Sequence, residues 1–257
     1  MKKQVCDLTV INNTRLNHDN YLIELKPSIK LENIQPGQFV NIQVKDSPTT
    51  FLRRPFSIHD VNYYNNTFAI LVKTVGDGTF KLSKIEKNET LDVVFPLGNG
   101  FSEPSKGEKI LLIGGGVGIA PMMHMARESK NIGVEVHILL GARSESDHIL
   151  VNEFSQFGQV HLTTDDGTLG THGFVTDHEV MSNKWKFDRF YCCGPDPMMH
   201  AVAKRAKALN TECEVSLENM MACGFGVCLC CVTKTKSEGH VCVCSEGPVF
   251  NVERLDW

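Results

Sequence analysis

The chain has 257 residues, of which 42% are hydrophobic and 22% are charged, and its formal net charge is -4. This composition is typical of a globular protein with room for two domains and a small appendage. No run of Lys and Arg indicates nucleic-acid binding, and no apolar stretch approaches the ~20 residues of a membrane span.

The cysteines and the N-terminus point to a reducing compartment. The chain holds ten cysteines, and its first residues, 1–7, lack the apolar core of a signal peptide. We therefore expect a cytoplasmic protein whose cysteines remain thiols or bind metal instead of forming disulfides.

Residues 1–100 are predicted to be all-β. Six short segments with strand-like composition are separated by the turn residues Gly37, Pro48, Gly76 and Gly98. Short strands at such spacing favour a closed antiparallel barrel. The predicted strands are 3–12, 20–24, 39–44, 54–59, 67–75 and 90–95.

The pattern changes after a connection rich in Gly, Pro and Ser at 96–109. Apolar strands then alternate with helices, which predicts an α/β domain with a doubly wound, mostly parallel sheet. The expected strands are 110–113, 135–140, 160–164, 189–193 and 213–217, and the expected helices are 120–130, 149–157 and 197–209. We place the domains at 1–100 (barrel), 101–210 (α/β domain) and 211–257 (small C-terminal module).

The segment Arg53–Ile58 suggests a flavin site on the barrel. In a strand, Arg54 and Phe56 share one face and Ser57 points to the other. A guanidinium pairs with a pyrophosphate, an aromatic ring stacks on a flavin, and a hydroxyl binds the ring edge. Downstream, Gly76–Thr79 precedes a helix-like stretch whose free N–H groups suit phosphate. Alone, each segment fits an edge strand or an ordinary turn, but together they favour flavin.

A glycine-rich turn joins the first α/β strand to its helix. Gly114, Gly115, Gly116 and Gly118 are four glycines in five residues, and Pro121 follows them. Such a turn lets the backbone approach a pyrophosphate at a helix N-terminus. A turn without a ligand is the weaker alternative, because the glycines would carry a large entropic cost.

A second nucleotide marker ends the strand 189–193. Cys193 and Gly194 are small, and they leave room for a nicotinamide against a flavin at the C-terminal edge of the sheet. The loop 141–147 follows a neighbouring strand and suits the ribose. Its acids favour NAD, whereas Arg143 and Ser144 suit a 2′-phosphate, and we expect NAD.

The most informative segment contains Cys223, Cys228 and Cys231, which have the C-x4-C-x2-C spacing of a plant-type [2Fe–2S] site. Gly224 and Gly226 allow positive φ, so the loop can wrap a cluster and direct N–H groups at the sulfurs. A zinc knot or a set of buried thiols is the alternative, but zinc sites usually show pairs of closely spaced cysteines.

The fourth ligand is left open by the spacing. Cys242 and Cys244 both follow Cys231 at loop distance, and we expect a strand over 241–244 with one of the two thiols facing the cluster. Cys230 breaks the x4/x2 spacing and is not expected to be a ligand. Three other thiols are interpreted as small buried hydrophobes: Cys6, Cys192 and Cys213.

In this order, the four markers resemble the ferredoxin–NADP reductase superfamily, and above all the iron–sulfur electron-transfer subunits of dihydroorotate dehydrogenase B. The resemblance spans nearly the whole chain and rests on Arg-Arg-Pro-x-Ser, Gly-Gly-Gly-x-Gly-x-Ala-Pro, Cys-Gly-Pro-x-Pro-Met, and Met-x-Cys-Gly-x-Gly-x-Cys with Cys-x-x-Gly-Pro-Val-Phe. It implies FAD contacts at Arg54, Pro55, Phe56, Ser57, Leu71, Val72, Lys73, Gly78 and Thr79. It implies cluster ligands at Cys223, Cys228, Cys231 and Cys244, since Cys244 precedes Gly-Pro-Val-Phe.

The resemblance also implies a division of labour in pyrimidine biosynthesis. A separate FMN-containing dihydroorotate dehydrogenase subunit would oxidise the substrate and pass electrons through [2Fe–2S] and FAD to NAD⁺, in a heterotetramer of two of each subunit. No catalytic acid or base is then expected in this chain. The alternatives are a related small subunit that links NAD(P)H to ferredoxin or sulfur compounds, and a structural module that holds zinc.

Overall fold

The computed structural model describes residues 3–45 and 47–257. The first unit is a closed antiparallel barrel with strand order β1-β2-β5-β4-β3-β6, as the sequence predicts. Alternating aliphatic side chains, together with Phe68 and Phe95, fill its interior. The strands are β1 (Gln4–Arg15), β2 (Asn20–Pro27), β3 (Phe39–Ile42), β4 (Arg54–Asn62), β5 (Thr67–Lys73) and β6 (Thr90–Leu97), with helix α1 (Asp77–Leu82) between the last two.

The second unit is a seven-stranded sheet with order β10-β9-β8-β7-β11-β12-β15, parallel except for the β12–β15 pair. This arrangement confirms the doubly wound α/β prediction. The strands are β7 (Lys109–Gly115), β8 (Glu135–Ala142), β9 (Gln159–Thr164), β10 (Thr171–His172), β11 (Arg189–Cys193), β12 (Glu212–Ser216) and β15 (Val249–Asn251), and the helices are α2 (Ala120–Asn131), α3 (Val151–Ser155) and α4 (Asp196–Leu209).

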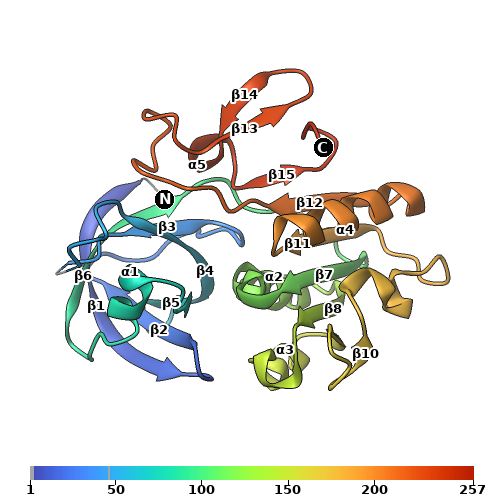
Figure 1. Cartoon of the computed structure of the whole chain (residues 1–257), viewed down its shortest axis with the longest axis horizontal. Helices are drawn as coiled ribbons and strands as arrows, with labels where there is room; N and C mark the ends of the chain where they lie inside the picture. Colours follow the sequence, from blue (N-terminus) through green and yellow to red (C-terminus); the bar gives the residue numbers. More distant parts are fainter. Residues whose placement is uncertain (1–2, 46) are drawn as a thin grey trace.

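The C-terminal segment lies across both other units (Figure 1). It carries the hairpin of β13 (Val232–Thr235) and β14 (Gly239–Cys242) and the short helix α5 (Val243–Glu246). Strands β12 and β15 fall within 211–257, yet they belong to the nucleotide-domain sheet. The boundary at 211 therefore stays a prediction, and the structure shows that the two units share a sheet across it.

The structure differs from the predicted elements mainly in short helices and strands. Helix α3 is shorter than the predicted 149–157, and β10, β13 and β15 were not predicted. In the described part of the chain, no helix is long and apolar enough to span a membrane.

Helix α2 packs between the sheet and barrel strand β4, and this junction buries two histidines. His59 is 3% exposed and its Nδ1 lies 2.9 Å from the Ala120 carbonyl oxygen, whereas His124 is 1% exposed. Neither ring nitrogen of His124 has a hydrogen-bond partner among the described residues. Burial lowers the pKa of His59 to about 4 and the pKa of His124 to about 3, so both imidazoles are neutral at pH 7.

These lowered pKa values make the junction sensitive to acid. A histidine of the unfolded chain titrates near 6.5, so the unfolded state takes up protons first as the pH falls. The stability that these neutral imidazoles contribute is fully present above about pH 6.5, and it is lost as the pH falls toward 4.

We predict that His124→Leu reduces the fall in Tm between pH 7 and pH 5. It removes one of the two groups that resist protonation, and it relieves an unpaired buried polar group, which costs about 1–3 kcal/mol. Differential scanning calorimetry of the holoprotein at both pH values is the measurement. His240→Gln, on the exposed end of the β13–β14 hairpin, is the control and should follow the wild type. An equally steep fall in His124→Leu would contradict this account.

Candidate functional site

The predicted flavin residues line one cavity of about 320 Å³ on the barrel. It forms because β4 and β5 separate at one end: β4 pairs with β5 only from Ile58 onward, while β5 pairs with β2 through Lys73. The facing edges of the two strands therefore have no strand partner there, and their backbone groups are free to meet a ligand. Seven of the predicted FAD residues line this cavity: Arg54, Pro55, Phe56, Ser57, Leu71, Lys73 and Thr79.

The other two predicted FAD residues contribute differently. The Val72 side chain is fully buried in the barrel core, so only its backbone is free to contact a flavin. Gly78 lies in the first turn of α1, where a Cβ atom would come within 2.9 Å of the Thr50 side chain. Side chains from the end of β12 and the following loop complete the wall, and the sequence analysis did not identify them: Ser216, Leu217, Glu218, Asn219 and Met221.

Arg53 and Arg54 are adjacent but are held in different ways. The Arg53 guanidinium binds Asp92, with Nη2 2.7 Å from Oδ1 and Nη1 3.0 Å from the Asp92 carbonyl oxygen. Arg54 has no carboxylate partner among the described residues, and its Nη1 donates a 3.4 Å hydrogen bond to the Leu52 carbonyl oxygen. Arg54 is therefore the arginine that is available to an anion in the cavity.

A second cavity, of about 490 Å³, lies at the C-terminal edge of the parallel strands. Gly115 and Gly116 line it from the predicted turn, while Gly114 and Gly118 are buried beneath. A Cβ atom at Gly118 would lie 2.3 Å from the Cys193 carbonyl oxygen, so this close packing of the turn on β11 requires glycine.

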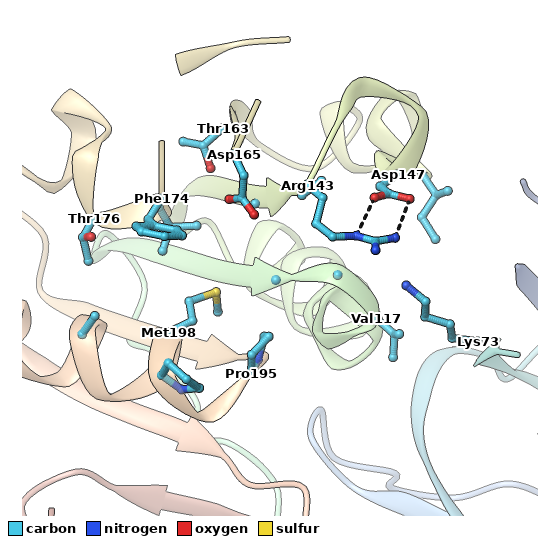
Figure 2. A pocket seen from close by; sticks show the side chains of 18 of the residues that line it. Lys73, Val117, Arg143, Asp147, Thr163, Asp165, Phe174, Thr176, Pro195 and Met198 are labelled. Atoms are coloured by element: carbon cyan, nitrogen blue, oxygen red, sulfur yellow. Dashed lines mark hydrogen bonds and ion pairs between the residues drawn. The ribbon is translucent and has the colours of Figure 1, made fainter. Parts of the chain in front are cut away.

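The end of β11 lies beside this turn, as the sequence predicts. Cys193 pairs in register with Gly114, and the Gly194 Cα atom is close to Gly118. Both residues are buried, and the cavity wall next to them in sequence is formed by Pro195 and Met198, which Figure 2 shows. Burial raises the pKa of the Cys193 thiol well above its usual value, so this thiol is neutral.

The two cavities meet at Lys73 and Val117, which line both of them. Figure 2 shows Lys73 reaching toward the nucleotide cavity from the barrel, beside Val117. The sequence analysis missed four other residues that line this cavity: Thr163, Asp165, Phe174 and Thr176. Asp165 directly follows β9, so its position after a parallel strand is a signal that could have identified it. Phe174 lies outside any strand and gives no such signal.

The predicted cluster loop is organised around sulfur atoms. Backbone N–H groups of Phe225, Gly226 and Cys244 donate to the sulfurs of Cys223 (3.3 Å), Cys244 (3.1 Å) and Cys231 (3.4 Å), respectively. Gly226 has φ +81°, which allows the turn that directs these donors inward. Cys228 lies on the exposed side of the loop.

The pKa values of these thiols differ with their surroundings. Burial opposes ionisation of Cys223, but N–H donation, first from Phe225, outweighs it and lowers the pKa to about 6. Burial and the neighbouring Cys231 sulfur raise the pKa of Cys244 to about 12. Thiols packed this closely repel each other once ionised, and a bound cation relieves that repulsion.

The two candidates for the fourth ligand face different partners. The Cys244 sulfur accepts a hydrogen bond from the Gly226 N–H, as a thiolate ligand does, whereas the Cys242 thiol faces the Gly226 carbonyl oxygen at 3.8 Å. The expected strand over 241–244 is wrong, because β14 ends at Cys242 and α5 begins at Val243. Among the described residues, no three His, Cys, Asp or Glu side chains converge as ligands of a single metal ion.

The cluster loop rests on the barrel next to the flavin cavity. Asn41 of β3 is fully buried, and its Nδ2 donates to the Ala222 carbonyl oxygen at 3.4 Å. A Cβ atom at Gly224 would come within 3.1 Å of Leu97. Met221 lines the flavin cavity, two residues before Cys223. The three sites therefore follow one another in the order cluster loop, flavin cavity, nucleotide cavity.

Comparisons with known proteins agree with this arrangement. Residues 218–256 match a family model described as the iron–sulfur cluster binding domain of dihydroorotate dehydrogenase B, and 112–204 match an oxidoreductase NAD-binding domain. Relatives named dihydroorotate dehydrogenase B (NAD(+)), electron transfer subunit, occur in Fusobacterium nucleatum (38% identical, 95% of each chain) and Bacillus velezensis (36% identical, 99% of each chain).

Solved structures are similar as well. An NADH-dependent reduced ferredoxin–NADP oxidoreductase structure, described for flavin-based electron bifurcation, is 31% identical with a TM-score of 0.87 and covers 97% of this chain and 90% of that one. The FAD/NAD-binding domain of nitric oxide dioxygenase from Vibrio cholerae is 21% identical with a TM-score of 0.68 and covers 81% of this chain and 97% of that one. The second similarity shows the fold alone.

Proposed function

The chain belongs to the family of dihydroorotate dehydrogenase B electron transfer subunits, and we propose that it passes electrons from a partner FMN-containing dihydroorotate dehydrogenase to NAD⁺ in pyrimidine biosynthesis. The observation that carries the proposal is the continuous arrangement of the cluster loop and two adjoining cavities. When bound, [2Fe–2S] exchanges single electrons and FAD exchanges both single electrons and hydride with a nicotinamide. The residues of this chain bind and orient these groups.

The proposed FAD site is the cavity between β4 and β5. Arg54 is available to neutralise the pyrophosphate, and Phe56 and Ser57 lie in the same wall for the ring system. Thr79 lines the cavity at the start of α1, and Gly78 precedes it in the same turn, where backbone N–H groups are proposed to meet phosphate.

The proposed NAD site is the second cavity. Gly114, Gly115, Gly116 and Gly118 bring the backbone close to the pyrophosphate at the entry to α2. The small residues Cys193 and Gly194 let the end of β11 pack behind the nicotinamide end. Because Lys73 and Val117 line both cavities, the two bound rings have a common wall.

The proposed cluster ligands are Cys223, Cys228, Cys231 and Cys244. The N–H groups directed at three of these sulfurs favour thiolates and contribute to the cluster potential. Cys242, which faces a carbonyl oxygen, is proposed to remain a thiol.

The surface around the cluster loop suits a protein partner. Four large apolar side chains are exposed there: Met220 (76%), Phe225 (45%), Val227 (79%) and Leu229 (63%). We propose that the catalytic subunit covers this surface and that the complex is a heterotetramer with two copies of each chain. None of the ten cysteines is paired in a disulfide, which supports the proposed reducing, cytoplasmic location.

A second candidate function is a link between NAD(P)H and ferredoxin. It is favoured by the 31% identity to the reduced ferredoxin–NADP oxidoreductase structure. The two candidates differ in the partner, so purification of the native complex separates them: an FMN-containing dihydroorotate dehydrogenase would support the first, and a ferredoxin-binding subunit the second.

We predict that Cys244→Ser strongly lowers the cluster content, whereas Cys242→Ser leaves it intact. The reason is that Cys244 provides a sulfur that accepts a loop N–H, while Cys242 faces an oxygen. Iron and acid-labile sulfide analysis and the EPR spectrum of the reduced protein are the measurements. Normal iron and an unchanged spectrum in Cys244→Ser would reverse the assignment.

We predict that Arg54→Ala weakens FAD binding by about one to two decades, because a charge-assisted hydrogen bond contributes roughly 1.5–3 kcal/mol. The FAD dissociation constant of the reconstituted apoprotein is the measurement, and iron content should stay near normal. Arg53→Ala is the matched comparison, because the Arg53 guanidinium binds Asp92. This change should lower Tm and leave the FAD dissociation constant near the wild-type value. Unchanged FAD affinity in Arg54→Ala would show that this arginine is not the pyrophosphate ligand.

We predict that the purified chain oxidises NADH with an artificial acceptor but has no dihydroorotate:NAD⁺ activity until the FMN subunit is added. The described residues form one barrel with one flavin cavity and offer no second flavin barrel. Steady-state assays with and without the partner are the measurement. Dihydroorotate-dependent NAD⁺ reduction by the isolated chain would refute this division, as would a complex that stays active after the cluster is removed.

A further inference from the structure

The nucleotide cavity contains an ion pair at its rim (Figure 2). Arg143 Nε lies 3.0 Å from Asp147 Oδ2, and Nη2 lies 3.5 Å from Oδ1. The Arg143 side chain is 69% exposed, but that of Asp147 is only 12% exposed. The guanidinium is therefore accessible to a ligand, and the carboxylate that holds it is largely covered.

The sheet register places this pair beside the pyrophosphate turn, where the adenosine ribose of the proposed nucleotide would lie. Gly115, in the pyrophosphate turn, pairs with Gly141 on the adjacent parallel strand β8. In sheets of this kind, the end of the strand next to the pyrophosphate turn carries the residues that meet the ribose 2′ position. Arg143 directly follows β8 and Asp147 lies four residues further on, and both line the cavity.

We infer that Asp147 sets the choice of NAD(H) over NADP(H) by holding the Arg143 guanidinium, which a ribose 2′-phosphate would otherwise bind. The inference rests on the proposed function, and it assigns the nucleotide preference of that site to one residue. The loop therefore contains the cation that a 2′-phosphate would need, but Asp147 withholds it.

Charge explains why this arrangement disfavours a 2′-phosphate. Such a group carries a charge of about −1.5 to −2 at pH 7. It would enter a cavity where Asp147 already occupies the guanidinium and where Asp165 adds a second carboxylate. The 2′-hydroxyl of NAD is neutral and can donate a hydrogen bond to a carboxylate, so the same groups favour it.

The test is a comparison of two probes, ADP-ribose and 2′-phospho-ADP-ribose, by calorimetric titration of the holoprotein. Asp147→Asn should raise the affinity for the phosphorylated probe relative to ADP-ribose by about tenfold or more, the expected effect of removing one nearby charge. Asparagine has the shape of aspartate and keeps an acceptor oxygen, and the Arg143 side of the pair is 69% exposed, so the variant should fold. The ratio of kcat/KM for NADPH and NADH, with ferricyanide as acceptor, should shift the same way.

Two further variants make the test specific. Glu145→Gln removes an equal charge from the same loop, but Glu145 does not line the cavity, so the probe ratio should stay at the wild-type value. Adding Arg143→Ala to Asp147→Asn should abolish the gain, because the released guanidinium is the proposed phosphate ligand.

A probe ratio within about twofold of wild type in both Asp147→Asn and Asp147→Ala would overturn the inference. A gain that persists without Arg143, or that Glu145→Gln reproduces, would also overturn it, because the effect would then be general electrostatics. Failure of the proposed function looks different: the wild-type protein would bind neither probe and would not oxidise NADH.

Discussion

Strand β12 connects the three units of the chain. It pairs in parallel with β11, in the nucleotide-domain sheet, and antiparallel with β15, which follows the cluster segment. Beyond its end, the Leu217 N–H donates to the Pro248 carbonyl oxygen at 2.9 Å, and Leu217 and Glu218 line the flavin cavity. The chain then enters the cluster loop, so the position of that loop relative to both cavities depends on one strand that is held on both sides.

A shared hydrophobic core makes this arrangement rigid. One cluster of buried side chains contains Phe39 and Leu97 from the barrel, Ile113 from the sheet, and Cys231 and Val243 from the C-terminal segment. Close-packed interiors resist relative movement, because any shift opens voids or forces overlaps. Electron transfer needs fixed separations between the groups that exchange electrons, and a continuous core provides them without a dedicated linker.

The sequence predicted the elements whose signals are local. The barrel strands alternate between apolar and polar residues over several positions, and the glycine turn at 114–118 has its own composition, so both were identified correctly. Strands β13 and β15 are only four and three residues long, and β15 pairs with the distant β12, so no local pattern distinguishes them. The expected strand over 241–244 failed because the chain turns into α5 immediately after β14.

Two features of the sites depended on contacts that no sequence pattern records. Arg53 and Arg54 are the same residue type, and only the pairing of Arg53 with Asp92 of β6 leaves Arg54 available. Likewise, the resemblance selected Cys244 over Cys242, but a physical reason for the choice appears only when the Gly226 backbone is seen to donate to one sulfur and to face the other with its oxygen. Family motifs pointed to segments of the chain, and tertiary contacts differentiate the residues within those segments.

The cluster loop has two features that are unfavourable in free energy, a left-handed backbone conformation and exposed apolar side chains. A bound partner would offset them. Leu229 adopts φ +57°, a left-handed conformation that costs a residue with a Cβ atom about 1–2 kcal/mol, and its side chain is 63% exposed. Val227, also exposed, adds further apolar surface beside the same sulfurs. Burial of these side chains against a protein surface would recover free energy at about 25 cal/mol per Å² and would exclude water from the cluster. The exposed side chains that raise the free energy of the free subunit therefore lie next to the cluster sulfurs. A partner that fits closely there shortens the path for electrons.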